Sequence, residues 1–171
     1  MPDASDPSPA SRFHIESSPI HGSGLFARGS IPTGARLFRV EGRVRRFAFD
    51  ENYALGATWF AVGPGRWIEP DRAHAAAHLN HSCSPNVAWT DTRWIVAISD
   101  IADGDELVLD YATTEIDPVW QMPCACHSPA CRGTIRAAPH EPALLRRRIA
   151  RVTPSFLRRH WLKIDIQRLS T

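Results

Sequence analysis

The 171-residue sequence has no long apolar run, because no stretch approaches the roughly 18 consecutive apolar residues that a membrane-spanning helix needs. Residues 1–11 contain three prolines and two aspartates, but they lack both the basic start and the apolar centre of a signal peptide. We expect them to form a disordered lead-in. These absences predict a cytoplasmic protein without membrane contact, and they leave a nuclear or nucleoid association open.

Lysine is nearly missing from the chain, since Lys163 is the only lysine among twenty basic residues. This bias toward arginine is typical of a GC-rich genome and by itself indicates no function. The formal net charge is only +2, but residues 139–171 hold eight basic against two acidic side chains. Such a segment is most often a solvated face over packed apolar residues, and contact with nucleic acid or an acidic partner is the open alternative.

Cysteine is scarce, with four residues in the whole chain. In a cytosolic protein, cysteines are more often thiolate ligands than disulfides. Cys124, Cys126 and Cys131 form a cluster, and Cys83 is the only other thiol, so the chain offers four sulfur ligands for a structural zinc ion. The spacing leaves open that Cys83 is an ordinary buried thiol and that the other three form a redox or incidental cluster.

Short apolar segments separated by turns predict one domain that is mostly β with minor α content. Strands are expected at 12–17, 24–27, 36–44 with a break at Glu41-Gly42, and 106–110, with hairpins at 58–62/66–69 and 87–90/93–99. A short helix is expected at 71–79, where alanine is frequent and Asp71 can cap the start. Two further helices are expected at 142–151 and 154–162, each beginning with proline and carrying an apolar stripe.

Three motifs follow one another along the chain. They are Gly22-x-Gly24, the heptapeptide Asn80-His81-Ser82-Cys83-Ser84-Pro85-Asn86, and Glu106-Leu107-Val108-Leu109-Asp110-Tyr111. The heptapeptide concentrates polar groups next to a strand-like run, which predicts a loop that binds ligands. Together with the spacing Cys-x-Cys-x₄-Cys-x-Gly, these motifs resemble SET-domain protein lysine methyltransferases that carry a post-SET zinc-binding tail, over about residues 12–134.

The resemblance implies a SET-domain (β-clip type) fold of small curved sheets with a pseudoknot. It implies a SET domain at 12–118 and a post-SET zinc segment at 119–135, and the residue pattern adds C-terminal basic amphipathic helices at 136–171. It also implies one structural zinc ion bound by Cys83, Cys124, Cys126 and Cys131. The implied activity is transfer of methyl groups from S-adenosylmethionine to a lysine side chain of a protein substrate, such as a histone or another basic protein.

The cofactor-binding residues that the resemblance implies are Gly22, Ser23, Gly24, Leu25, Asn80, His81, Tyr111 and Trp120. The backbone at 22–25 would approach the methionine end of the cofactor. The side-chain amide of Asn80 would contact the amino-acid portion, and the main chain of His81 the adenine. Trp120 would lie against the adenine ring, with an ordinary core tryptophan as the alternative.

Tyr111 matches the active-site tyrosine of the family, and Tyr53 falls where a second tyrosine often lines the lysine channel. Because a tyrosine pKa near 10 makes a poor base at neutral pH, we assign Tyr111 orientation and electrostatic work. The substrate amine must be neutral, and an apolar channel and the sulfonium charge both lower its pKa. Leu109 occupies the position that commonly governs the number of methyl groups, and an aliphatic side chain there predicts transfer of more than one.

The segment 73–79 departs from the family, which often has arginine and phenylalanine where this chain has Ala77 and His78. Those family residues help to shape the cofactor pocket. The departure therefore leaves open a non-catalytic SET-like module that binds zinc and S-adenosylmethionine without turnover. A weaker alternative is a zinc-stabilised nucleic-acid binder that works through the basic C-terminal helices.

Overall fold

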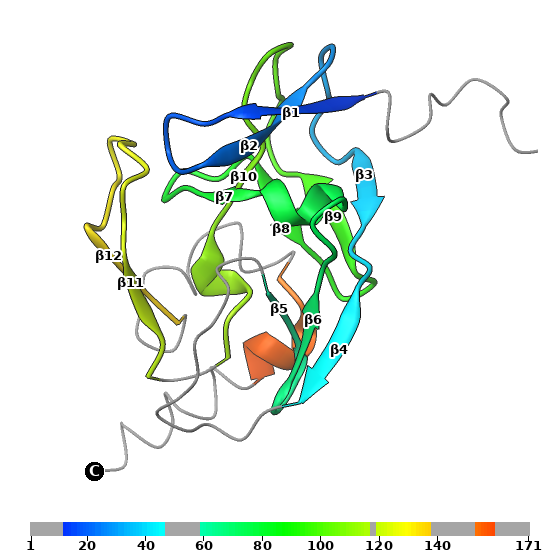
Figure 1. Cartoon of the computed structure of the whole chain (residues 1–171), viewed down its shortest axis with the longest axis vertical. Coiled ribbons are helices and arrows are strands. Elements are labelled where there is room, and N and C mark those ends of the chain that lie inside the picture. The colour runs from blue at the N-terminus through cyan, green and yellow to red at the C-terminus, as the bar shows by residue number, and fades with distance from the viewer. Residues whose placement is uncertain (1–11, 47–58, 117–118, 138–152, 160–171) are drawn as a thin grey trace, which may run out of the picture.

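The computed structural model describes residues 12–46, 59–116, 119–137 and 153–159. Within these ranges the chain forms five sheets of two or three short strands, two 3-10 helices and a helical segment at 155–159 (Figure 1). This arrangement confirms the prediction of a mostly β protein with minor α content. No helix among the described residues is long and apolar enough to cross a membrane.

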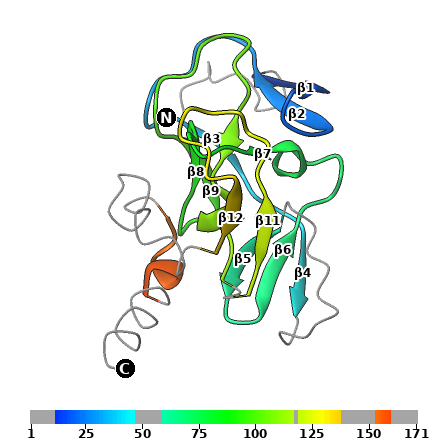
Figure 2. The same cartoon turned by 90° about the vertical axis from the view of Figure 1, so that its left-hand side faces the viewer.

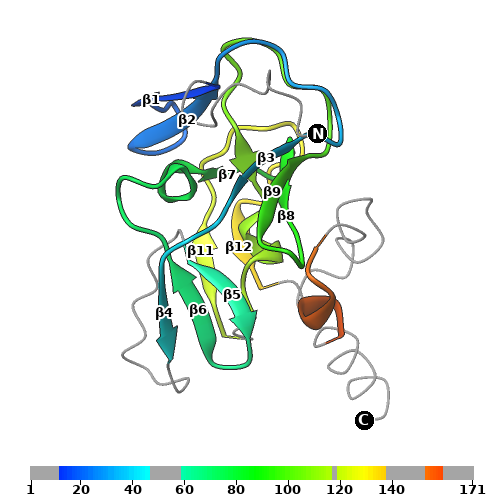
Figure 3. The same cartoon turned by 90° about the vertical axis from the view of Figure 1, so that its right-hand side faces the viewer.

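The first sheet is a hairpin that ends in the glycine-containing loop. Strands β1 (Phe13–Ser17) and β2 (Ser23–Ala27) pair antiparallel, with Ser17 opposite Ser23. Gly22 closes the turn with a φ of +54°, a conformation that glycine adopts without steric cost. The hairpin therefore presents residues 18–22 as a fixed loop at its end (Figure 3).

Two three-stranded sheets form the body of the molecule. One has the order β3 (Arg36–Arg39), β9 (Trp94–Ala97), β8 (Val87–Trp89), and the other β4 (Arg43–Arg46), β6 (Arg66–Glu69), β5 (Phe60–Gly63). The two predicted hairpins are confirmed as β5–β6 and β8–β9.

The break predicted at Glu41-Gly42 is confirmed, but the two parts of the strand predicted over 36–44 belong to different sheets, because the chain leaves one sheet there and enters another. The crossing needs Gly42, since a Cβ at that position would collide with the carbonyl oxygen of Glu69. The glycine thus allows β4 to lie directly beside β6.

The helix predicted at 71–79 is wrong in length. The structure has one turn of 3-10 helix, η2 (Ala75–His78), and its cap is the imidazole of His74, whose Nδ1 accepts the N–H of Ala76 at 3.1 Å. The helix cannot continue because Leu79 is extended, with a ψ of 107°, and leads directly into the next strand.

Strand β7 (Asn80–His81) pairs in parallel with β10 (Val108–Leu109), with Val108 opposite Asn80. The second 3-10 helix, η3 (Tyr111–Thr113), follows at once, capped by Asp110, whose Oδ1 accepts the N–H of Ala112. This pairing places the heptapeptide and the Glu-Leu-x-x-Asp-Tyr segment side by side.

A further hairpin, which the strand pattern did not predict, carries the cysteine cluster. Strands β11 (Gln121–Pro123) and β12 (Thr134–Arg136) pair antiparallel and enclose residues 124–133. Figure 2 shows this hairpin on the side that faces the viewer.

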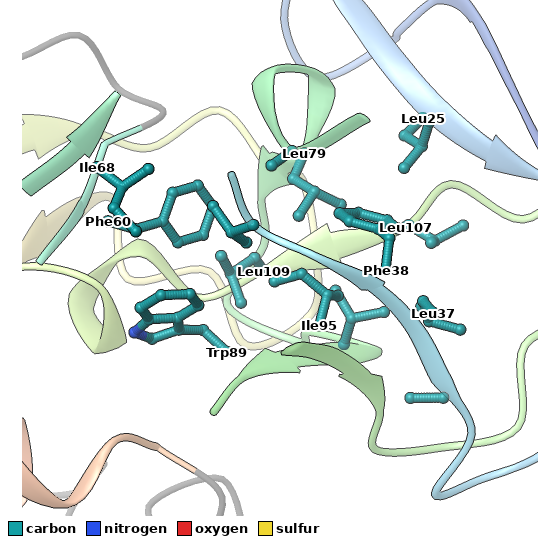
Figure 4. Close-up of a cluster of buried hydrophobic side chains, with 14 of the residues drawn as sticks. Leu25, Leu37, Phe38, Phe60, Ile68, Leu79, Trp89, Ile95, Leu107 and Leu109 are labelled. Carbon is teal, nitrogen blue, oxygen red and sulfur yellow. The ribbon is translucent and has the colours of Figure 1, made fainter. Parts of the chain in front are cut away.

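A continuous core joins the other four sheets (Figure 4), while the β11–β12 hairpin packs on Ala112 in a second, smaller cluster. Leu25, Phe60, Trp89 and Leu109 each come from a different sheet and are at most 2% exposed. Each such side chain contributes on the order of 1.5–3 kcal/mol through burial. Leu157 of the segment 155–159 also belongs to this core, which confirms the described part of the helix predicted at 154–162. The helix predicted at 142–151, the lead-in and Tyr53 lie outside the described residues.

Candidate active site

A cavity of about 200 Å³ opens between three segments that are far apart in the sequence. One wall comes from the β1–β2 loop, a second from β7 with Tyr111, and a third from the β11–β12 hairpin. The lining residues are Ile20, His21, Asn80, His81, Tyr111, Met122, Pro123, Cys124, Ala125 and Ile135. Three of the predicted cofactor-binding residues, Asn80, His81 and Tyr111, therefore meet in one pocket, and a segment of the predicted zinc tail closes it.

Asn80 fastens the loop to β7 through one end of its side-chain amide. Its Nδ2 donates to the carbonyl oxygens of His21 and Ser23, both at 3.1 Å, and to Oε1 of Glu106 at 2.8 Å. Three oxygens around one end of the amide fix the NH₂ group there and place Oδ1 at the other end. Among the described residues, Oδ1 accepts no hydrogen bond, so this residue offers the pocket an acceptor.

Glu106 also holds the β1–β2 loop in place. Its carboxylate accepts from the Ser18 hydroxyl at 2.9 Å as well as from Asn80. A Cβ on Gly24 would collide with this carboxylate. Gly24 thus makes room for Glu106, while Gly22 provides the left-handed turn.

Tyr111 lies beside His81 and is only 5% exposed. Its hydroxyl donates to the carbonyl oxygen of Leu79 at 2.7 Å. Burial, together with the negative charge of Glu106, raises the pKa of Tyr111 above its usual range. The phenol therefore stays protonated at neutral pH, in agreement with the expectation that it orients groups and does not act as a base.

The imidazole of His81 connects Tyr111 to the thiol of Cys83. The backbone N–H of Tyr111 donates to Nδ1 at 3.2 Å, so the proton of the neutral ring is on Nε2, which faces Cys83 Sγ at 3.3 Å. Burial and the positive charge of Arg132 lower the pKa of His81 to about 3, against an opposing effect of the Leu109 carbonyl. Neutral His81 thus donates a hydrogen bond to the sulfur.

Three thiols and His81 form a compact group, with ligand atoms within 4.8 Å of one another: His81, Cys83, Cys124 and Cys126. Cys83 Sγ and Cys124 Sγ are 3.8 Å apart. A tetrahedral zinc ion with Zn–S bonds of about 2.3 Å separates its sulfur ligands by about 3.8 Å, so this pair fits the ion.

The fourth predicted thiol, Cys131, is exposed and lies outside this group, with its Sγ 4.0 Å from the carbonyl oxygen of Cys124. His81 is poorly placed as the alternative ligand. If its Nε2 bound a metal, its proton would move to Nδ1, where the N–H of Tyr111 already points.

Hydrogen bonds surround the thiols with donors, as thiolate sulfur requires. Cys83 Sγ accepts from the backbone N–H and from Nε of Arg132, at 3.4 and 3.3 Å. Burial alone would raise the pKa of Cys126, but hydrogen bonds from the Cys83 N–H and from Ser128 lower it to about 6.

Arg132 also ties this cluster to the centre of the fold. Its Nη2 donates to Oδ1 of Asp110 at 2.6 Å, and the Asp110 side chain is fully buried. Asn86 forms a similar tie, because its amide bonds the Glu106 carbonyl and the Val108 N–H, both at 2.8 Å. Asp110 and Asn86 thus hold neighbouring segments together and have structural roles.

The remaining predicted site residues take other places. Leu25 is a core side chain, so only its backbone can face a ligand. The Ser23 hydroxyl bonds His78 at 2.8 Å and not the pocket. Trp120 is partly buried and packs with Ala112 and Ile135, next to the pocket residue Met122. Its packing fits the core alternative and leaves the adenine contact a prediction.

The sequence reasoning assigned no role to Glu106, Ser18 or Arg132. Glu106 stood within a recognised motif, and Arg132 directly follows a cysteine, so both positions carried a signal. Ser18 carried none, because only the register of β1 against β2 brings it to Glu106.

Comparison with known proteins gives one family. The family model for the SET domain matches residues 22–112, more than half of the chain. The chain is 31% identical over 141 residues to "Histone-lysine N-methyltransferase TRX1" of Oryza sativa subsp. japonica, covering 72% of this chain and 14% of the relative. It is 29% identical over 138 residues to "Histone-lysine N-methyltransferase, H3 lysine-4 specific" of Schizosaccharomyces pombe, covering 71% of this chain and 15% of the relative.

Among solved structures, the fold is similar to KRYPTONITE in complex with mCHG DNA and SAH, with a TM-score of 0.54 and 26% identity. That likeness covers 72% of this chain and 29% of the other. The chain thus spans about a seventh of the two relatives and less than a third of the solved structure. The matched range contains Gly22, Gly24 and Tyr111, and from the fold, the pocket and this match we conclude that the chain belongs to the SET-domain family.

Proposed function

We propose that this protein transfers methyl groups from S-adenosylmethionine to the side-chain amine of a lysine in a protein substrate. The observation that carries the proposal is the pocket, where Asn80 presents an unpaired amide oxygen beside His81 and Tyr111. An acceptor of this kind suits the ammonium group of an amino-acid ligand. The mainly apolar walls suit the rest of such a ligand.

The bound donor would supply a methyl group on a positively charged sulfur. The neutral lysine nitrogen bonds the methyl carbon while the C–S bond breaks and leaves its electron pair on sulfur. The methylated nitrogen is then an ammonium group, whose proton passes to solvent. The protein's contribution is to orient the groups and exclude water. The Tyr111 hydroxyl donates its proton to the Leu79 carbonyl oxygen. Its own oxygen keeps a lone pair and can accept a hydrogen bond from an amine. An apolar surrounding also lowers the pKa of the substrate amine from its value of about 10.4.

Zinc has a structural role in this proposal. Cys83, Cys124 and Cys126 would bind the ion, with Cys131 as the fourth ligand. The ion supplies a positive charge that holds four thiolates together, and no residue of the cluster needs to contact the substrate. Since Cys124 and its neighbours form one wall of the pocket, the metal would fix the shape of the donor site.

We propose a basic protein such as a histone as the substrate. The relatives named above are histone-lysine methyltransferases, one of them specific for lysine 4 of H3. We place the enzyme in the cytoplasm, or with nuclear or nucleoid material if its basic segment 139–171 contacts nucleic acid. That segment lies largely outside the described residues, so the contact remains a prediction.

The second candidate is a SET-like binding module without turnover, which the replacement of the family's arginine and phenylalanine by Ala77 and His78 favours. Incubation with tritiated donor and a panel of histones and other basic proteins separates the two. We expect label on lysine with the wild type, and a fall of roughly 100-fold in rate with Tyr111→Phe, the order found when a hydrogen-bonding group at a reaction centre is lost.

Donor affinity is measured in the same preparations, and we expect Tyr111→Phe to keep it. Donor binding without transfer to any protein of the panel would support the non-catalytic module. Absence of donor binding by the zinc-loaded wild type would refute both candidates, and a DNA affinity that falls steeply with salt would then favour a nucleic-acid binder.

A further inference from the structure

His78 hydrogen-bonds Ser23 and Arg72 next to the loop of residues 18–22, which we call the donor loop. Its Nδ1 lies 2.8 Å from the hydroxyl oxygen of Ser23, and its Nε2 lies 2.8 Å from the carbonyl oxygen of Arg72. A carbonyl oxygen only accepts, so Nε2 carries the proton. In the neutral ring Nδ1 then accepts, and the Ser23 hydroxyl donates to it. Both hydrogen bonds thus fix the ring orientation and its tautomer.

Ser23 connects His78 to the pocket residue Asn80. Its hydroxyl is held by His78, and its carbonyl oxygen accepts from Nδ2 of Asn80 at 3.1 Å. Asn80 follows His78 by two residues, so His78, Leu79, Asn80 and Ser23 form a closed ring of covalent and hydrogen bonds. Figure 3 shows the helical turn that precedes β7 below the β1–β2 hairpin, where this ring closes.

We propose that His78 is a positioning residue of the donor site, which acts through Ser23 to hold Asn80 with its amide oxygen toward the ligand. This inference rests on the proposed function. It gives a role to the position at which the chain departs most clearly from its family. The short η2 turn and the Ser23–His78 bond take over the support of the pocket that a larger side chain gives elsewhere.

We expect removal of the His78 imidazole to weaken binding of the donor. In His78→Ala we expect the affinity for S-adenosylhomocysteine, measured by calorimetry, to fall about threefold to tenfold, which corresponds to about one hydrogen bond. The KM for the donor should rise by the same factor, whereas kcat at saturating donor should change less than twofold. Ser23→Ala should have the same effect, and the double variant should be no weaker than either single one.

Two conservative variants separate positioning from simple packing. In His78→Asn, the amide oxygen lies near the place of Nδ1 and can accept from Ser23, so affinity should return to within about twofold of the wild type. In His78→Gln, the amide reaches the place of Nε2 and contacts Arg72 only, so affinity should stay low. His14→Ala is the matched control, because His14 lies on β1 and its ring pairs with Glu16.

Unchanged affinity in His78→Ala, additive losses in the double variant, or equal affinities of the Asn and Gln variants would overturn the role of His78. A fall in kcat and in thermal stability with an unchanged KM would also overturn it, because that pattern indicates a structural role. If the wild type itself does not bind S-adenosylhomocysteine, the proposed function fails first, so the two failures are distinguishable.

Discussion

Arg132 is the residue on which two parts of the site depend. Its guanidinium bonds the fully buried carboxylate of Asp110, and its Nε and backbone N–H bond the sulfur of Cys83. The same side chain therefore neutralises a buried charge and orients a proposed metal ligand. A lysine could not replace it, because an ammonium group lacks the planar fork that reaches both partners.

Replacing Arg132 by alanine should be strongly destabilising, because it removes the guanidinium that forms an ion pair with the fully buried Asp110 carboxylate. We expect a loss of about 3 kcal/mol in the free energy of unfolding, measured in urea with saturating zinc. Arg28→Ala is the control, since that exposed side chain makes no hydrogen bond or ion pair with the described residues, and it should cost less than about 0.5 kcal/mol. Equal losses in the two variants would contradict the proposed role of Arg132.

Leu109 occupies the position that, by resemblance to the family, would govern the number of methyl groups transferred. The side chain is 1% exposed and lies among Phe60, Trp89 and Ile95 in the core (Figure 4). It has no hydroxyl that could hold a water molecule against the substrate amine. We therefore expect mass spectrometry of a fully reacted substrate to show di- or trimethyl-lysine.

The change Leu109→Tyr should restrict the product to monomethyl-lysine, while the volume-conserving change Leu109→Met should leave the product pattern as in the wild type. Monomethyl-lysine as the only wild-type product at saturation would disprove the assignment.

At the scale of elements, the donor loop depends on how closely β2 approaches the segment before β10. Gly24 is the point of contact, because a Cβ there meets the Glu106 carboxylate. In Gly24→Ala, Glu106 must move and give up its bonds to Asn80 and Ser18. We predict that donor affinity falls about tenfold, which is the loss expected for one hydrogen bond to a charged group.

Gly34→Ala serves as the comparison for this prediction. Gly34 has a φ of +87° and open space at its Cβ position, so alanine there strains the backbone without touching the site. It should lower stability but leave donor affinity unchanged. Matching losses of affinity in the two variants would show that Gly24→Ala acts through general instability.

Elements with local sequence signals, such as turn residues between two strands, could be predicted from the sequence. Elements whose form depends on tertiary contacts could not. The hairpins at 60–69 and 87–97 carry turn residues between strand-forming segments, and both are confirmed. The alanine-rich stretch 71–79 favours a helix by propensity, but Asn80 must enter β7, and the tertiary pairing wins. The hairpin β11–β12 has no such signal, because its strands are short and polar residues and cysteines lie between them.

The site itself was predictable to the extent that its residues stand within motifs. Asn80, His81 and Tyr111 converge on one pocket as expected. The supporting residues Ser18 and His78 were not predictable, since their roles arise only from the packing of the β1–β2 loop against Glu106 and η2.

At the scale of the whole molecule, the thiol cluster connects the heptapeptide, in the middle of the SET region, to the hairpin that follows that region. Cys83 lies in the heptapeptide and Cys124 and Cys126 in the β11–β12 hairpin, so a shared metal would fix the hairpin as a wall of the pocket. Zinc binding can contribute on the order of 10 kcal/mol to the folding of small modules. The hairpin has only three residues per strand, so we expect its position to depend on the metal.

The central claim is that a metal-held hairpin completes a donor pocket, and a calorimetric titration with S-adenosylhomocysteine tests it most directly. The titration is made with the zinc-loaded protein, with chelator-treated protein and after zinc is returned. We predict one ligand per chain in the zinc-loaded state, a loss of affinity of about tenfold or more on chelation, and recovery on return of zinc. Equal affinity with and without zinc, or no binding by the zinc-loaded protein, would contradict the claim.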